Sequence, residues 1–522
     1  MLRALINCHL YDNKDTAILI EDNQIRKTGT NEEIEKELSS AEEVIDLRGM
    51  TVVPGFVDSH MHLLELGYYL SNAQLENCHD LNDIREKLHN RLGTLKKDHW
   101  LIGRGWNENA YPDHKGPDKD FLDSISKDVP IALTRSCGHV MAVNSKALEL
   151  AQIDEDTTAD GGEIDSEHGI LKENAMELIR SAMPKPDVME LEDYIVRGIQ
   201  YANSCGITTV GSDDFLSVTM DYRDPLDAFE KLSYQERMNI RVSEQCEFTD
   251  SKSFSEFLDD GYTFDVGNDY FRIGPLKLIL DGSLGARTAA LTRPYHDDPQ
   301  NKGMLLMDEE ELSTDIKLAQ RFNMPVIAHA IGDRAVDQIL KAYEENLYEG
   351  NPLHCGLVHC QILRKDQIEK ILKMKLSCYF QSQFIDEDAA ILKDRVDEEY
   401  LDTSYPFKTL SEGTLSSNGS DAPVEMPDVM RGIELAVTRQ SLLHPSASMN
   451  PSESLTIEEA MASYTTDGAK QLFMHDRIGK IAAGYLADLT VLDQDIVSID
   501  PHEIHNVKVM MTIMDGRTVF ER

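Results

Sequence analysis

The residues best suited to chemistry are Asp58-Ser59-His60-Met61-His62, which directly follow the apolar segment 52–57. Side chains alternate between the two faces of an extended chain, so His60 and His62 point to the same side at the end of a strand. Two imidazoles placed in this way can bind one cation. Two unrelated surface histidines would show the same spacing, because histidine is common at exposed positions. The spacing alone therefore leaves both interpretations open.

Three further candidate ligands each stand at the end of a β-like run. His329 ends MPVIAHA, His359 ends CGLVHC and Asp421 ends TLSSNGSD. Each histidine taken singly is compatible with a structural role. Four histidines and one carboxylate at a common edge would instead indicate a metal site, because imidazole and carboxylate are the ligands of catalytic metal ions.

The elements that must position these residues alternate between strand and helix. Apolar β-like runs occur at 52–58, 207–211, 240–245, 275–280, 324–330, 355–360, 375–380 and 414–421, with amphipathic helical segments between them. Eight such units predict an α/β fold, a (β/α)8 TIM-type barrel. Active sites of this fold lie at the carboxyl ends of the strands. The candidate ligands therefore share one rim of the predicted barrel.

Two regions depart from this alternation. Residues 1–55 and 475–522 carry short β-like runs separated by Asn, Asp and Gly turns, which predicts a small β-sandwich domain formed from both termini. The barrel then occupies 56–474. The roughly 150 residues between its first two strands far exceed a loop plus a helix. We therefore expect an α+β insertion at about 70–200.

Composition excludes several classes of protein. Lys and Arg total 51 against 93 for Asp and Glu, a net charge of −42, so nucleic acid is not an expected partner. Eight dispersed cysteines without a CxxC pair predict reduced thiols and a cytoplasmic location. No signal peptide and no run of about 18 apolar residues is recognisable, so we expect no membrane association. We expect a homodimer only because homodimers are the most common oligomers of soluble proteins.

The predicted ligands suit Zn²⁺ best, although Fe, Mn, Co and Ni accept the same groups. Three protein ligands and an open position are enough for one catalytic zinc. Four histidines and an aspartate therefore allow two divalent metal ions, or one ion with some histidines left to bind substrate.

The chain resembles the amidohydrolase superfamily of metal-dependent hydrolases through PGFVDSHMH, the later single histidines and the GSDAP turn. GRGWNEN, RSCGHVMAVNSKAL, GILKEN, KLILDGSLGARTAAL and HAIGDRAVD resemble the branch containing N-substituted formamide deformylases. The resemblance covers essentially the whole chain. It implies that the ligands of strands one, five and six and the acid of strand eight are His60, His62, His329, His359 and Asp421.

The resemblance also suggests roles outside this set. Lys277, in the fourth strand, would be a carboxylated lysine that bridges two metal ions; the alternative is an ordinary lysine paired with Asp281 or another acid. His139 would bind the substrate carbonyl, unless its role is structural. Three further residues are candidates for substrate binding, and each has a simpler alternative. They are Trp106 (core packing), Arg287 (an ion pair with an acid) and Glu173 (a solvated helix start).

These features predict a metal-dependent amidohydrolase that cleaves a C–N bond, in an amide or an N-substituted formamide, with metal-activated water. Asp421 would act first as general base and then as general acid. A non-hydrolytic isomerase, lyase or decarboxylase on the same scaffold is the alternative. A non-enzymatic assembly or regulatory protein is a third hypothesis, but such a protein would be expected to have lost ligands.

Overall fold

The structure is a computed structural model that describes residues 1–522 except 12, 39–40 and 98. Its largest sheet has eight parallel strands in the order β20-β19-β18-β17-β16-β15-β14-β7. The strands are β7 (Phe56–Met61), β14 (Ile207–Ser212), β15 (Arg241–Cys246), β16 (Phe271–Ile279), β17 (Val326–Ala330), β18 (Gly356–His359), β19 (Ser377–Phe380) and β20 (Ser416–Asn418). The two outer strands meet, because Ser59 Oγ donates to Asn418 O at 2.9 Å and Asp421 N donates to His60 O at 2.8 Å. The predicted TIM-type barrel is confirmed as a nearly closed one.

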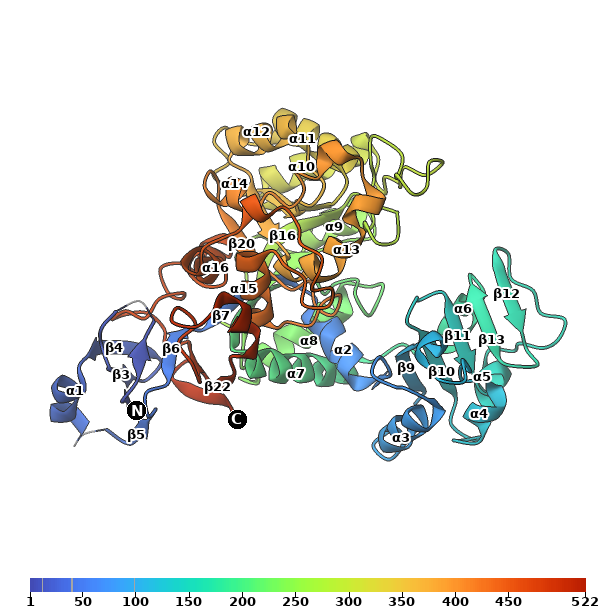
Figure 1. The fold of residues 1–522 in the computed structure, drawn as a ribbon, viewed down its shortest axis with the longest axis horizontal. Coiled ribbons are helices and arrows are strands. Elements are labelled where there is room, and N and C mark those ends of the chain that lie inside the picture. The colour runs from blue at the N-terminus through green and yellow to red at the C-terminus, as the bar shows by residue number, and fades with distance from the viewer. Residues whose placement is uncertain (12, 39–40, 98) are drawn as a thin grey trace. The chain divides into compact units, whose positions relative to one another are not determined.

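Helices separate the barrel strands along the chain and follow the last of them (Figure 1). They are α7 (Val188–Ser204), α8 (Arg223–Tyr234), α9 (Ser251–Asp259), α10 (Glu309–Arg321), α11 (Asp333–Asn346), α12 (Lys365–Met374), α13 (Ile385–Arg395), α14 (Phe407–Ser411), α15 (Val429–Thr438), α16 (Ile457–Ser463) and α17 (Thr466–Gln471). Side-chain capping marks the start of four of them, α9, α10, α15 and α16. At the start of α10, Asp308 accepts hydrogen bonds from the backbone N–H groups of Glu310 and Glu311, and acidic side chains in the first turn complement the helix dipole.

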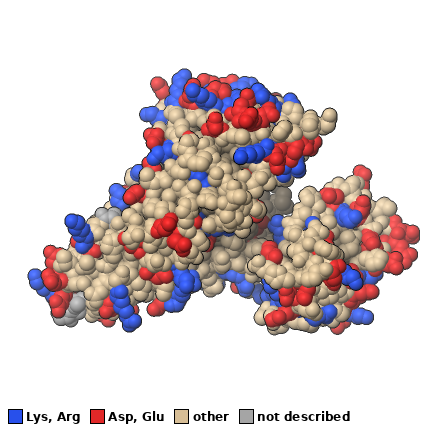
Figure 2. Space-filling model, in the orientation of Figure 1, with Lys and Arg blue, Asp and Glu red and all other residues tan. Residues whose placement is uncertain are grey.

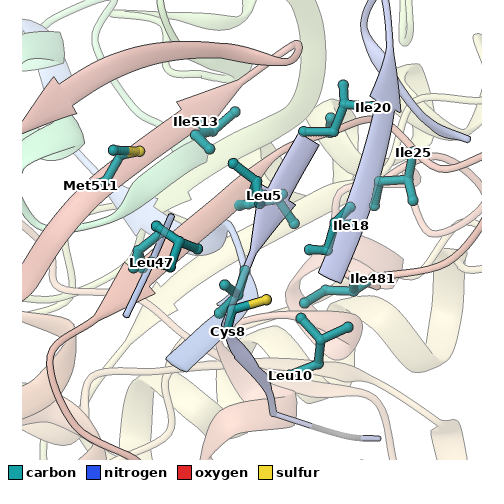
Figure 3. Packing of buried hydrophobic residues seen from close by; sticks show 14 residues of the cluster. Leu5, Cys8, Leu10, Ile18, Ile20, Ile25, Leu47, Ile481, Met511 and Ile513 are labelled. Atoms are coloured by element: carbon teal, nitrogen blue, oxygen red, sulfur yellow. The ribbon is translucent and has the colours of Figure 1, made fainter. Parts of the chain in front are cut away.

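A β-sandwich is formed from both ends of the chain. One sheet has the order β4-β3-β1-β5 and the other β2-β6-β21-β22-β23. The strands are β1 (Leu2–Ile6), β2 (His9–Leu10), β3 (Ala17–Glu21), β4 (Gln24–Gly29), β5 (Glu43–Asp46), β6 (Thr51–Pro54), β21 (Leu489–Leu492), β22 (Val509–Met514) and β23 (Arg517–Glu521). Buried aliphatic side chains from both sheets, among them Leu5, Ile18 and Ile513, pack against one another (Figure 3). This apolar core holds the two termini together.

Two sequence predictions for the amino-terminal region are wrong in detail. The all-β pattern expected there misses helix α1 (Asn31–Leu38). The expected first barrel strand, 52–58, is in fact two strands, because β6 pairs with β21 in the sandwich and β7 pairs with β14 in the barrel. Gly55 separates them, and a Cβ at this position would lie 2.3 Å from Thr208 Oγ1. The change of sheet therefore requires a glycine.

The long segment between β7 and β14 folds as a second compact unit, Leu66–Arg197, while Met1–Glu65 and Gly198–Arg522 make up the first. Its six-stranded sheet has the order β12-β13-β11-β10-β9-β8. The elements are α2 (Leu63–Ser71), which begins in the first unit, β8 (Ala73–Gln74), α3 (Leu81–Leu92), β9 (Leu101–Trp106), α4 (Lys119–Asp123), β10 (Ile131–Arg135), β11 (Val140–Val143), α5 (Ser145–Leu150), β12 (Gly162–Asp165), β13 (Ile170–Glu173) and α6 (Met176–Ala182). The unit has an apolar core of its own, as expected for an α+β insertion.

Charged side chains of both signs are interspersed on the face shown in Figure 2. All eight cysteines are free thiols. Among the residues that the structure describes, none of the helices has the length and apolar character needed to cross a membrane.

Candidate metal centre

Three side chains converge where the first and last barrel strands meet. His60 lies in β7, His62 directly follows that strand, and Asp421 follows β20. One donor atom from each of the three lies within 4.8 Å of the other two. The Nε2 atoms of both histidines lie 3.2 Å from the same carboxylate oxygen, Asp421 Oδ1. The structure thus brings the first and last of the predicted ligands together.

The remaining predicted ligands extend this group around the rim. Lys277 in β16 is buried, and its Nζ lies 3.3 Å from His60 Nε2. The ring of His359, at the end of β18, lies 5.9 Å from that of His60, and the ring of His329 in β17 lies 4.4 Å from that of His359. All six predicted ligands therefore form one continuous cluster at the carboxyl ends of the strands.

Hydrogen bonds to Nδ1 orient three of the four imidazoles. His60 Nδ1 bonds to the amide oxygen of Gln245, His62 Nδ1 lies 2.6 Å from Asp213 O, and His329 Nδ1 lies 3.0 Å from Asp281 Oδ1. A ring that donates through Nδ1 keeps the lone pair of Nε2 free for a cation, as is usual in metal sites. His359 differs, because its Nδ1 is buried and has no hydrogen-bond partner in the described part of the chain.

The backbone near the cluster is constrained. His359 and Asp421 both adopt positive φ angles, 86° and 61°, which are unfavourable for residues with side chains. Asp58 holds the turn before Asp421, because its carboxylate accepts hydrogen bonds from the backbone N–H and the hydroxyl of Ser420. A Cβ at Gly419 would lie 2.5 Å from His60 N. The sequence SNGSD therefore lets the eighth strand pass close to the first.

The protonation states suit a cation. Burial lowers the pKa of His60 to about 4 and that of His359 well below its usual value. Burial alone would raise the pKa of Asp421, but its hydrogen bonds with His60 and His62 hold it well below the usual range. Burial acts to lower the pKa of His62, but its hydrogen bond to Asp421 and the charge of Asp213 raise it to about 10. The neutral imidazoles of His60 and His359 and the protonated ring of His62 thus lie near an ionised carboxylate, and a cation bound at His62 Nε2 would displace that ring's proton.

The donor set fits a divalent metal ion. Ligand atoms roughly 2.1 Å from a tetrahedral zinc lie roughly 3.4 Å apart. The separations of 3.2 Å between Asp421 Oδ1 and the two Nε2 atoms are close to that value. Nitrogen and carboxylate donors in this geometry match zinc and related transition metals rather than calcium or magnesium.

The predicted substrate-binding residues occupy two different settings. Arg287 follows β16 and makes a paired contact with Asp297, at 3.0 Å from Nε and 2.7 Å from Nη2. In the second unit, exposed His139 Nδ1 lies 2.9 Å from Glu173 Oε2. Trp106 is buried in the apolar core of that unit and donates from Nε1 to Leu133 O at 3.2 Å. Their contact with substrate stays a prediction.

Sequence reasoning missed several polar residues that lie at or just beyond the ends of the second, third and fourth strands. Lys277 pairs with Asp213, whose Oδ2 lies 3.0 Å from its Nζ, and not with Asp281. Gln245 supports His60, while Asp281 supports His329. Burial and the charge of Asp213 raise the pKa of Glu247 to about 7. Their position at the carboxyl ends of strands is the signal in the sequence that could have identified them.

A TIM-type barrel with a cluster of histidines and an aspartate at the carboxyl ends of its strands is the architecture of a metal-dependent hydrolase. The chain belongs to the amidohydrolase family, whose sequence profile matches residues 43–520. It is 35% identical over 519 residues to YtcJ of Bacillus subtilis, a protein classed with the amidohydrolases, with 97% of this chain and 96% of that protein covered. It is 23% identical to the N-substituted formamide deformylase of Arthrobacter pascens, covering 97% and 95% of the two chains.

Solved structures agree with this assignment. An uncharacterised metal-dependent hydrolase from Pyrococcus horikoshii superposes with a TM-score of 0.80 at 29% identity, over 96% of this chain and 99% of the other. The zinc complex of atrazine chlorohydrolase TrzN from Arthrobacter aurescens superposes with a TM-score of 0.54 at 14% identity, over 99% and 95% of the two chains, which shows a shared fold. The chain is therefore a metal-dependent hydrolase that binds a divalent cation.

Proposed function

We propose that the enzyme hydrolyses a C–N bond in a small amide or an N-substituted formamide. The observation that carries the proposal is the convergence of His60, His62 and Asp421 on one point at the barrel rim. The similarity to the Arthrobacter deformylase over nearly the full length of both chains supports the choice of bond.

We propose zinc as the cation, held by His60, His62, His329, His359 and Asp421. Lys277 is the candidate for a carboxylated ligand, because its amine is buried within 3.3 Å of His60 Nε2. The nearby Asp213, 3.0 Å from Nζ, is equally suited to pair with an unmodified lysine. Mass measurement of the intact, metal-loaded protein in native conditions decides between the two forms of the lysine.

A bound divalent cation would supply Lewis-acid activation of water and of the scissile carbonyl. The other steps belong to the chain's own residues. Asp421 is buried, ionised and within hydrogen-bond distance of two imidazoles, so it accepts the proton of the attacking water. The same carboxyl group then returns the proton to the leaving nitrogen. His60 and His62, both hydrogen-bonded through Nδ1, keep their Nε2 atoms directed toward this carboxylate.

The proposal is tested on protein reconstituted with Zn²⁺ and assayed against a panel of N-formyl and N-acyl amines. We expect about one or two zinc ions per chain, release of the amine, and incorporation of ¹⁸O from labelled water into the acid product. Asp421→Asn should lower kcat by about 100- to 10,000-fold, while Asp467→Asn on α17 should leave kcat unchanged. An active enzyme whose product contains no ¹⁸O would instead be an isomerase, lyase or decarboxylase, and full activity of Asp421→Asn would remove this residue from the mechanism.

The eight free thiols support a reducing, cytoplasmic environment for this enzyme. Cell fractionation checks the location, and light scattering checks the expected homodimer.

A further inference from the structure

Asp281 is a buried carboxylate just beyond the end of β16, and only 1% of its surface is exposed. Its Oδ1 accepts a hydrogen bond from the backbone N–H of Ile331 at 3.0 Å and lies 3.0 Å from His329 Nδ1. Its Oδ2 accepts from the backbone N–H groups of Ala290 and Gly332 at 2.9 and 2.8 Å. One side chain therefore joins the loop after β16, the start of α11 and the imidazole of His329.

These contacts decide which nitrogen of His329 carries the proton. Three of the four partners of Asp281 are backbone N–H groups, which can only donate. A carboxylate in such a setting acts purely as an acceptor, so the fourth partner, His329 Nδ1, must also donate. The ring is then protonated on Nδ1, and Nε2 keeps its lone pair.

We propose that Asp281 is a positioning residue that holds His329 in the Nδ1–H tautomer and thereby presents the Nε2 lone pair to the metal centre. The inference rests on the proposed function in that His329 is taken as a ligand. His329 differs from the other three histidines of the cluster, because of these four it is the one whose Nδ1 has a carboxylate partner in the described part of the chain. A carboxylate partner raises the basicity of a ligating imidazole more than an amide or a carbonyl does.

Asp333, at the start of α11, provides a matched control. It is also fully buried and anchors the same loop, by accepting a hydrogen bond from the backbone N–H of Thr292 at 2.8 Å. Its remaining partners include Tyr400 Oη at 2.9 Å and Arg364 Nη1 at 2.8 Å. Both acids thus tether the loop after β16, but only Asp281 contacts a histidine of the cluster.

The experiment compares zinc affinity in Asp281→Asn and Asp333→Asn, measured by competition with a chelator and by the absorption spectrum of the Co²⁺-loaded protein. The new amide of Asp281→Asn can donate to His329 Nδ1 and so favour the tautomer with a proton on Nε2. We expect zinc affinity to fall by about 10- to 100-fold in this variant, with an altered Co²⁺ spectrum. Asp333→Asn should lower thermal stability and leave both measurements unchanged. Equal zinc affinity in the two variants would overturn the inference.

A second measurement does not depend on the folding of any Asp281 variant. The ring nitrogen shifts of ¹⁵N-histidine-labelled, metal-free wild-type protein report each tautomer, and His329→Gln identifies the signals of His329. We expect a protonated Nδ1 and an unprotonated Nε2. A proton on Nε2 would overturn the inference. Wild-type protein that takes up no divalent cation would overturn the proposed function instead, while these shifts would still decide the role of Asp281.

Discussion

The barrel rim and the sandwich core are both buried, but they are built from opposite kinds of residue. The sandwich core consists of aliphatic side chains such as Ile18, Ile20 and Ile513, which need no partner other than one another. At the rim, His60 and Lys277 are as thoroughly buried, and each requires a specific polar neighbour. Burial therefore stabilises the first region and costs free energy in the second.

The free-energy cost of burying polar groups at the rim is reflected in the backbone angles and hydrogen bonding there. His359 combines a positive φ angle with a buried Nδ1 that has no partner among the described residues, and Asp421 also has a positive φ. Strain and incompletely satisfied polar groups are tolerated where they position reactive groups. The comparison predicts that substitutions at the rim remove activity more than stability, and that substitutions in the sandwich core do the reverse.

His60→Ala should have the largest effect on function. Removing an imidazole that contacts both Asp421 and Lys277 should abolish stable metal binding and lower kcat/KM by at least about 1,000-fold. Metal content and kcat/KM after reconstitution measure this effect, and thermal unfolding of the metal-free protein measures stability. A collapse of stability with metal binding intact would contradict the comparison.

Ile18→Ala should show the opposite behaviour. Ile18 is fully buried in the sandwich core, so its truncation leaves a cavity and should lower the free energy of unfolding by about 2 to 5 kcal/mol. Urea denaturation measures this loss, while zinc content and kcat per folded molecule should match those of the wild type. A change in zinc content would show that the sandwich supports the metal centre.

The sequence predicts the barrel and the place of the candidate ligands at its rim better than the contacts between these residues. Strand positions follow from apolar runs that tertiary packing reinforces, and His60, His329 and Asp421 lie at strand ends, where the fold places chemistry. The ion-pair partner of Lys277 could not be predicted from strand positions in the sequence. Asp213 and Asp281 are both acids near strand ends, and only the stagger of neighbouring strands decides which one reaches the lysine.

The amino-terminal errors have a similar origin. The run 52–57 is continuously apolar, apart from Gly55, because both β6 and β7 are buried, so no polar residue marks the change of sheet. Only the close approach of Thr208 to Gly55 shows that this glycine joins a strand of the sandwich to a strand of the barrel. Information of this kind lies in contacts between residues distant in the chain.

Gly419→Ala tests how closely the first and eighth strands must approach. An added Cβ would lie 2.5 Å from His60 N, which is backbone and cannot rotate away. We expect a loss of about 1 to 3 kcal/mol in stability together with weaker zinc binding, measured by urea denaturation and chelator competition. Gly285→Ala is the control, because a Cβ there meets nothing within 4 Å and the backbone is not in the left-handed region. Equal effects of the two substitutions would show that this approach does not matter for the centre.

Arg287→Ala should have the smallest effect of these substitutions. It tests whether the substrate site extends from the barrel rim as far as Arg287. The side chain is 34% exposed and pairs with Asp297, which Arg395 also contacts, so its loss should leave thermal stability unchanged. If Arg287 binds a substrate carboxylate, KM should rise by about tenfold or more for amides that carry one and stay constant for neutral amides. Arg293→Ala, which removes another exposed arginine of the same loop, should change neither KM. An equal KM in wild type and Arg287→Ala for both classes of amide would confine Arg287 to its ion pair with Asp297 and place it outside the substrate site.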